Sequence, residues 1–431
     1  MNSPSDRPSR RTVNRDPAHV ESLDADVCVI GSGAAGAAAA LETASAGLSV
    51  ILVEAAEHLG GQAVGSSIGT VCGLYGNGPD PARVTHGLLP DLVAAMVVEG
   101  SARPRRARNT VIISYEPSVW ARRVEDALVG AGVVPMTGAV VTEVRLDGPS
   151  VSGVRVATRW GAAEIRADNW IDASGDAVLP WLAGLPVFVP DPPILGSVMA
   201  VLGGVGTEMI DGLPRSVFHR LVEQDSDREL LPRLDGFVFS SPRPGEVLMN
   251  MTHVPTPTDP VGATRAGIEG RRQVDRLLEV FRRGLPEAFG RAFVVNYGGL
   301  GIRQTRTISG RATLTTDDVR RGHRPDDAVA RCSWPIELHT RTAAADWEEF
   351  GDDHMHFVPL GAMLPAGLDN VITAGRCIDA ETAALASVRV MGPCMAMGRA
   401  AAEVVRLAGT DPYHQVDVAR LQANLRENLN P

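Results

Sequence analysis

The sequence predicts an α/β fold, with a parallel sheet that carries an inserted antiparallel meander and a second, α+β domain. Three observations support this prediction. A glycine-rich turn, GSGAAG at 31–36, joins a short apolar strand to a helix of small residues. Strand-like segments fill residues 133–173 after a helical period at 119–132. A last buried strand, 370–374, ends at another glycine.

The glycine-rich turn lies in a strand–turn–helix–strand context. Apolar residues 26–30 precede it, small residues 37–46 follow it as a helix, and 49–53 form a second buried strand. A G-x-G-x-x-G turn in this context is typical of a Rossmann-type dinucleotide site, because the helix N-terminus then faces a pyrophosphate.

Each glycine of the turn has a separate physical task. Gly31 makes the bend, Gly33 lets the backbone approach the phosphates, and Gly36 permits close packing of helix on strand. Glu54 lies 18 residues past Gly36, near the spacing of roughly 20 expected for an acid that holds ribose hydroxyls. The turn predicts further cofactor contacts from Ser32 and Ala35.

A second glycine pair, Gly60-Gly61, follows Glu54 and precedes Gln62. NAD dehydrogenases have no need of such a pair. The segment resembles the large group of FAD-binding flavoproteins, in which a glycine doublet at this place packs near the pyrophosphate. The resemblance implies FAD as the cofactor, with Gly60, Gly61 and Gln62 beside it.

Composition and charge exclude several classes of function. The 431 residues exceed the size at which one core normally stops growing, so two packed units are expected. The net charge of −10 and the lack of a basic stripe argue against nucleic-acid binding, and RPRRARN at 103–109 is interpreted as a solvated loop. No apolar run is long enough to span a membrane.

The chain contains no lysine, so all 41 basic residues are arginine, as codon bias in a GC-rich genome would produce. This absence excludes lysine Schiff-base chemistry. Five scattered cysteines disfavour disulfide, zinc and iron–sulfur sites and fit a reducing cytoplasm. HMH at 354–356 has no accompanying acid cluster, so no metal site is predicted.

The C-terminal half carries further motifs. GIRQTR (301–306), PDDAVARCSWPIELH (325–339), AGRC (374–377) and SVRVMGPCM (387–395) together resemble a family of FAD-dependent oxidoreductases, from Asp24 to Gly409. The fold implied is the FAD-binding fold of glutathione-reductase type. Pro393 is expected at the first position of a helix whose N-terminus points at the flavin.

The resemblance implies roles for single residues. His339 is the first candidate for a base, with a structural hydrogen bond as the alternative, and Arg389 and Arg303 would contact flavin or substrate. Asp176 is interpreted as a helix N-cap. Cys72 and Cys377 are interpreted as buried thiols rather than reactive ones. Further cofactor contacts are expected from Val140, Gly175, Gly375, Arg376 and Arg389.

The domain organisation follows from these motifs. The predicted units are a disordered tail (1–22), a discontinuous FAD-binding domain (23–185 and 352–409), a substrate-binding domain (186–351) and a C-terminal tail (410–431).

The leading functional prediction is an FAD-dependent oxidoreductase that oxidises a small organic molecule by hydride transfer to the flavin. The alternative is a single-component FAD monooxygenase or halogenase-like enzyme that uses NAD(P)H and oxygen. A non-catalytic scaffold stabilised by FAD is the third possibility.

Overall fold

The computed structural model describes residues 10, 12, 20–226 and 228–430. The predicted disordered tail, 1–22, falls mostly outside these residues. Glu21 and Ser22 are described, and they already belong to the first strand, β1 (Glu21–Ile30).

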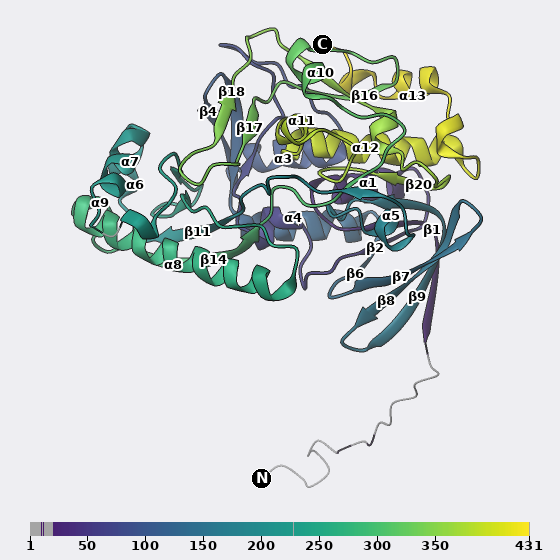
Figure 1. The fold of residues 1–431 in the computed structure, drawn as a ribbon, viewed down its shortest axis with the longest axis horizontal. Helices are drawn as coiled ribbons and strands as arrows, with labels where there is room; N and C mark the ends of the chain where they lie inside the picture. Colours follow the sequence, from purple (N-terminus) through teal and green to yellow (C-terminus); the bar gives the residue numbers. More distant parts are fainter. Residues whose placement is uncertain (1–9, 11, 13–19, 227, 431) are drawn as a thin grey trace.

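The central sheet has the strand order β6-β2-β1-β9-β8-β7, with β20 added beside β9 (Figure 1). β2, β6 and β20 run parallel to their neighbours, whereas β7, β8 and β9 form an antiparallel meander. The predicted parallel sheet with an inserted meander is therefore confirmed. These strands are β2 (Val50–Val53), β6 (Val134–Met136), β7 (Val140–Asp147), β8 (Ser150–Thr158), β9 (Gly161–Asp172) and β20 (Val371–Thr373).

Strand β9 carries two neighbours on one of its edges. Its first half pairs with β8, and its last three residues pair with β20. On the other edge Asp172 lies opposite Ile30, the last residue before the glycine-rich turn. The late strand thus returns to the first sheet, as the sequence predicts. The expected strand 170–173 is the end of the longer β9.

Two helices rich in small residues cover the sheet, α1 (Ala34–Ser45) and α12 (Met391–Ala408). They pack closely because Gly398 has no side chain. A Cβ atom there would lie only 2.9 Å from the Cβ of Ala38. Helix α12 begins at Met391, so Pro393 is its third residue and the predicted first position is wrong by two residues. Pro393 still lies in the first turn, where a helix tolerates proline.

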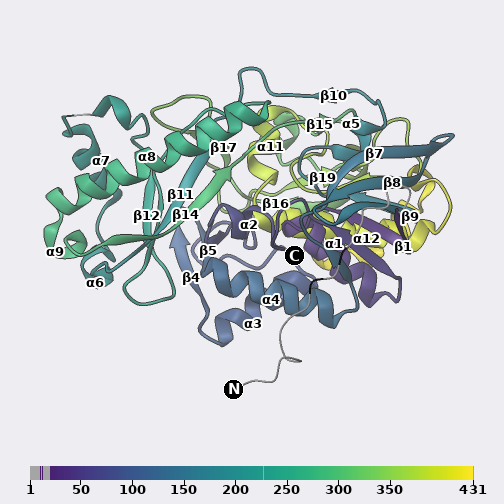
Figure 2. The same cartoon turned by 90° about the horizontal axis from the view of Figure 1, so that it is seen from below.

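A second sheet, of order β12-β13-β11-β14, packs against the long helix α8 (Pro260–Gly284) (Figure 2). The helical pattern of the sequence continues to Phe289, but the helix is broken at Leu285, because Pro286 disfavours helical backbone in the residue before it. The strands are β11 (Ser197–Gly203), β12 (Phe237–Ser240), β13 (Val247–Asn250) and β14 (Phe293–Gly301), and the helices beside them are α6 (Thr207–Ile210), α7 (Arg215–Glu223) and α9 (Pro286–Phe289).

Part of the range 186–351 joins the core of the first sheet. Strand β16 (Ala328–Cys332) pairs with β19 (His356–Pro359), and its side chains pack in the same cluster as α1 and α12. Residues 410–430 also pack on that cluster. They contain α13 (Val418–Asn424), and Leu421, Leu425 and Leu429 are buried.

The basic run 103–109 is not a solvated loop. Residues 102–107 form β4 (Ala102–Ala107), which pairs with β5 (Thr110–Tyr115). The alternation of arginine with other residues has the period of two that puts Arg103 and Arg105 on one face of a strand. That face turns toward the second sheet, where Arg103 donates a hydrogen bond to the carbonyl oxygen of Ser240.

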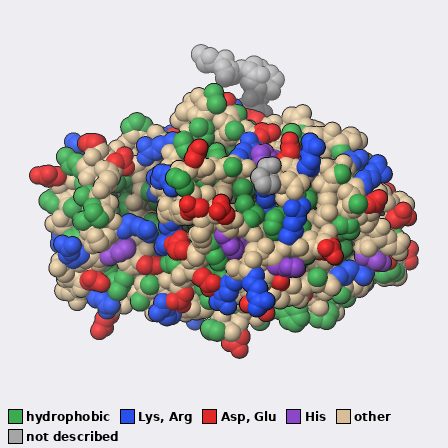
Figure 3. Space-filling view, turned by 90° about the horizontal axis from the view of Figure 1, so that it is seen from above, with side chains coloured by type: hydrophobic (Ala, Val, Ile, Leu, Met, Phe, Trp, Pro, Cys, Tyr) green, Lys and Arg blue, Asp and Glu red, His purple; other side chains and the backbone are tan. Residues whose placement is uncertain are grey.

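Charged side chains of both signs are interspersed over the face of the molecule in Figure 3. None of the described helices is both long and apolar enough to span a bilayer. The remaining elements are α2 (Gln62–Gly65), β3 (Thr70–Val71), α3 (Leu88–Val98), α4 (Pro117–Gly130), α5 (Val178–Leu182), β10 (Val187–Phe188), β15 (Thr307–Ile308), α10 (Thr316–Arg321), β17 (Ile336–Leu338), β18 (Asp346–Glu348) and α11 (Thr382–Val388).

Candidate functional site

A cavity of about 950 Å³ extends from the glycine-rich turn to the second sheet. One end is lined by Gly31, Gly33 and Glu54, and the other by side chains of β4, β12 and β17. A single space therefore joins the predicted cofactor site to the predicted substrate side.

The three glycines of the turn have the environments that their predicted tasks require. Gly31 has φ +93°, and a Cβ atom there would lie 2.6 Å from the carbonyl oxygen of Ala173. A Cβ on Gly36 would lie 3.1 Å from the Cβ of Ala173. A Cβ on Gly33, by contrast, would meet nothing within 4 Å. The chain therefore leaves open space at the one glycine that should face a pyrophosphate.

Glu54 holds the turn as well as lining the cavity. Its Oε2 accepts hydrogen bonds from the amide of Ser32 at 2.8 Å and from the Ser32 hydroxyl at 2.6 Å, and its Oε1 accepts from the amide of Ala56 at 2.8 Å. The Ser32 Oγ in turn accepts from the amide of Gly60 at 3.0 Å. Ser32 thus connects the acid to the glycine pair.

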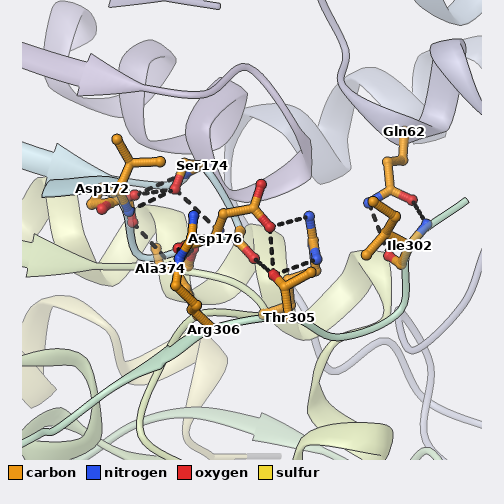
Figure 4. A network of polar contacts seen from close by, with 12 residues as sticks. Gln62, Asp172, Ser174, Asp176, Ile302, Thr305, Arg306 and Ala374 are labelled. Atoms are coloured by element: carbon orange, nitrogen blue, oxygen red, sulfur yellow. Dashed lines mark hydrogen bonds and ion pairs between the residues drawn. The ribbon is translucent and has the colours of Figure 1, made fainter. Parts of the chain in front are cut away.

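The glycine pair lies directly against the turn. A Cβ atom on Gly61 would be 2.7 Å from the Cα of Gly33, and both residues line the cavity. Gln62 lines it too, but both groups of its amide are already used. Its Nε2 donates to the carbonyl oxygen of Ile302 at 2.9 Å, and its Oε1 accepts from the amide of Ile302 at 2.8 Å (Figure 4).

The turn after β9 is held by two carboxylates, the half-buried Asp176 and the fully buried Asp172 (Figure 4). Asp176 accepts from the hydroxyl of Thr305 and pairs with Arg376 at 3.2 Å. Its predicted role as N-cap is wrong, because Ala177 occupies that position of α5 without a side-chain cap. Asp172, four residues earlier, accepts instead from the amide of Leu179 at 2.7 Å.

Other expected cofactor contacts lie on the same half of the cavity. Val140, Gly175, Gly375 and Arg376 all line it, as does Ala35. A Cβ on Gly375 would lie 3.3 Å from the Cβ of Ala35, so the late strand ends beside the start of α1.

The opposite half is walled by arginines stacked on aromatic rings. The guanidinium carbon of Arg105 lies 4.8 Å from the ring centre of Phe239, and that of Arg215 lies 4.5 Å from Phe237. Arg108 stacks at 3.6 Å on Trp347. No sequence motif marks Arg215. Arg105 was marked only by the alternation of its strand.

Arg303 and Arg389 line the cavity between these halves. Arg303 donates to the carbonyl oxygen of Leu195 at 2.7 Å and to the hydroxyl of Ser197 at 2.9 Å. Arg389 donates to the carbonyl oxygen of Glu337 at 3.2 Å, and its buried Nε has no partner among the described residues. Burial lowers the pKa of both guanidinium groups.

His339 lies behind the wall rather than on it. The side chain is fully buried and is absent from the cavity lining. Its Nε2 lies 2.9 Å from Oε1 of Glu337, which does line the cavity, and its Nδ1 lies 2.9 Å from Nε2 of His253. Any role of His339 toward a ligand therefore acts through Glu337. Glu337 was detectable as the residue two positions earlier on the same strand face.

The cysteines at the site are protonated thiols. Burial raises the pKa of Cys72 and of Cys394, both on the cavity wall, to about 12. Cys377 is buried and its pKa is also raised by burial. His354 and His356 contact each other, and the described part of the chain contains no group of three or more residues suited to hold a metal ion.

This geometry defines a dinucleotide-binding α/β protein in which one cavity runs from the glycine-rich turn to the arginine–aromatic wall. The model of a family described as FAD dependent oxidoreductase matches residues 26–425, and the chain belongs to that family. It is therefore an enzyme, and FAD is its cofactor. No curated protein matches the chain.

Solved structures with a similar fold share little sequence with the chain. A geranylgeranyl bacteriochlorophyll reductase-like protein from Thermoplasma acidophilum is 13% identical, with a TM-score of 0.48, over 94% of this chain and 84% of that one. The flavin-dependent brominase Bmp2 is 14% identical, with a TM-score of 0.45, over 94% and 83%. The p-nitrophenol 4-monooxygenase from Pseudomonas putida DLL-E4 is 13% identical, with a TM-score of 0.42, over 95% and 82%.

The residues present fit FAD. The open space at Gly33 suits a pyrophosphate, and the Glu54 carboxylate suits a ribose hydroxyl pair. The first turn of α12 contributes Met391 and Cys394 to the cavity, so its amide groups lie near the middle of the space. A helix N-terminus there favours negative charge.

Proposed function

We propose that the enzyme oxidises a small organic substrate by hydride transfer to FAD. The observation that carries the proposal is the single cavity of about 950 Å³, which has the glycine-rich turn at one end and the arginine–aromatic wall at the other. A cofactor laid along the turn and a substrate held by the wall would meet in the middle, beside Arg389.

The flavin would supply the hydride acceptor. Gly31, Gly33, Glu54 and Gly61 would hold the dinucleotide, and Arg303 and Arg389 would orient the substrate by charged hydrogen bonds. Glu337 would relay the proton released on hydride removal to His339, because its carboxyl group lines the cavity and contacts that ring.

The proposal includes the two domain roles that the sequence predicts. Residues 23–185 and 352–409 would bind FAD, and much of 186–351 would cover the substrate. The five free cysteines support a reducing compartment such as the cytoplasm.

A monooxygenase or halogenase-like reaction with NAD(P)H and oxygen is the second candidate. The turn Ser174-Gly175-Asp176, which lines the cavity after a buried strand, favours it because the turn resembles the one in that group.

Anaerobic reduction of the purified holoprotein separates the two candidates. The enzyme is mixed with aromatic and aliphatic hydroxy acids or amino acids, or with NADPH, and bleaching of the flavin is followed by stopped flow. Bleaching by a substrate without NADPH supports hydride transfer. Bleaching by NADPH alone, with oxygen then needed for product, supports the monooxygenase and excludes the first proposal.

A further inference from the structure

Four arginines on the cavity wall have no acidic partner. Within the described part of the chain, no carboxylate lies within 4.0 Å of the guanidinium nitrogens of Arg105, Arg215, Arg303 or Arg389. The buried Nε atoms of Arg105 and Arg389 also lack a hydrogen-bond partner. Arg105, Arg303 and Arg389 are half-buried, whereas Arg215 is exposed, and a charge drawn out of water is costly unless an opposite charge joins it.

The carboxyl groups near this wall leave most of that charge uncompensated. Asp235 pairs with Arg233 at 2.8 Å, and Glu349 pairs with Arg108. Asp211 lines the cavity and accepts from the Ser240 hydroxyl. Glu337 is the remaining candidate for neutralising the four arginines, and its own hydrogen bonds decide what charge it brings.

Glu337 ends a chain of three side chains whose protons can be counted. His253 Nδ1 lies 2.8 Å from the carbonyl oxygen of Thr342, so that nitrogen must donate. The contacts from His253 to His339 and from His339 to Glu337, both 2.9 Å, need one proton each. Three contacts therefore hold three protons.

This count makes the three side chains neutral as a group, wherever the movable proton lies. With two imidazole rings and one carboxyl group, three protons give a net charge of zero in every arrangement. Burial and the neighbouring Arg303 and Arg233 lower the pKa of His339, and burial lowers that of His253 to about 3. His253, His339 and Glu337 together therefore add no net negative charge to the wall. Four guanidinium groups then face one carboxylate, that of Asp211.

The same wall is apolar between its charges. Phe237 and Phe239 lie on one face of β12, and Trp347 lies 6.4 Å from Phe237, ring centre to ring centre. Trp334 lines the space as well. Such a surface suits the body of an aromatic or other planar ligand, and guanidinium groups held on aromatic faces are already oriented for an oxyanion.

We propose that the substrate is an organic anion, a carboxylate or similar oxyanion on an aromatic or planar apolar body, with its charged group bound by Arg105 and Arg215. This inference rests on the proposed function, since it names the substrate class of the same cavity.

Calorimetric titration of the holoprotein with 2-naphthoate and with its neutral analogue 2-naphthamide tests the inference. We expect naphthoate to bind about tenfold to a hundredfold more tightly, because hydrogen bonds to charged groups contribute that much. Arg105→Gln and Arg215→Gln, which remove the positive charge but keep a polar side chain, should each remove most of the difference. Arg159→Gln is the matched control, because Arg159 also stacks on an aromatic ring, Trp160, but is exposed outside the cavity.

Equal affinities for the acid and the amide would overturn the proposal. A preference for the acid that survives in both wall variants but disappears in Arg376→Gln would also overturn it, because the anion would then occupy the cofactor half. The FAD content of each sample is measured separately. Protein that takes up no FAD yet prefers naphthoate through Arg105 would contradict the proposed function while supporting the anion site.

Discussion

The Ser32 hydroxyl joins the two parts of the dinucleotide site, because it donates to Glu54 Oε2 at 2.6 Å and accepts from the amide of Gly60 at 3.0 Å. The acid that should bind ribose thus also fixes the glycine-rich turn. A change at either side chain affects the cofactor and the turn together.

Glu54→Ala should weaken FAD binding by about 1.5–3 kcal/mol, because a buried ribose hydroxyl pair loses its charged acceptor. Ser32→Ala should have a smaller effect of about 1 kcal/mol. Glu57→Ala, an exposed acid outside the cavity, is the control. Affinities are measured by titrating apoprotein with FAD. An unchanged affinity in Glu54→Ala would place the ribose elsewhere.

Gly33→Ala and Gly36→Ala should fail in different ways. A methyl group on Gly33 enters open space, so the apoprotein should keep its stability while FAD binding falls about tenfold or more. A methyl group on Gly36 would overlap the turn, so stability should fall by about 1–3 kcal/mol. Urea unfolding of apoprotein and FAD titration separate the two effects. Equal stability losses would contradict this assignment.

Arg389→Ala should lower the flavin reduction potential by on the order of 30 mV, because loss of about 1.4 kcal/mol of stabilisation of the reduced form corresponds to that shift. Arg389→Lys should restore part of it, and FAD should stay bound in both. His339→Ala, behind the wall, should leave the potential nearly unchanged and slow the proton-coupled step. Dye equilibration measures the potential. No shift in Arg389→Ala would make the arginine structural.

The proton count predicts an uncommon protonation state for both buried histidines. In ¹⁵N NMR of histidine-labelled holoprotein, His253 and His339 should each carry the proton on Nδ1, with Nε2 bare. Glu337→Gln should preserve this pattern, because an amide N–H can donate to Nε2 of His339. His219→Gln helps to assign the histidine signals without changing His253, His339 or Glu337. A neutral His253 beside a His339 that is protonated on Nε2 alone would refute the count, because the contact between the two rings would then hold no proton.

Acid should destabilise the fold through His356. Burial lowers its pKa to about 3, below the unfolded value of about 6.5. The unfolded state then binds more protons between these values, so stability is present above pH 6.5 and falls as pH drops, by up to about 1.4 kcal/mol per unit. His356→Gln should show a shallower loss in urea unfolding from pH 7 to 5. Identical slopes would mean that other groups dominate.

The sequence predicted the parts of the site that depend on local backbone. The turn 31–36, Glu54 and Gly61 could be found because steric needs and short spacings fix them. His253 could not, because its partner His339 lies 86 residues away and nothing near either residue marks the pair. Arg105 was misinterpreted because a run of basic residues was given more weight than its period of two.

The error at Asp176 has a different cause. Asp176 stands two residues before the first residue of α5, close to the position of an N-cap. In the structure the chain at Ala177 adopts left-handed backbone, which turns the helix start toward Asp172. Sequence spacing alone does not reveal that Asp172 accepts from the start of α5, because that hydrogen bond depends on where β9 places the Asp172 side chain.

The paired amide of Gln62 and Ile302 ties together segments 240 residues apart in the manner of a strand pair. Motion that swung the second sheet away from the glycine-rich turn would have to break both hydrogen bonds at once. The side of the cavity lined by Gln62 and Ile302 is therefore held rigidly against the glycine-rich turn.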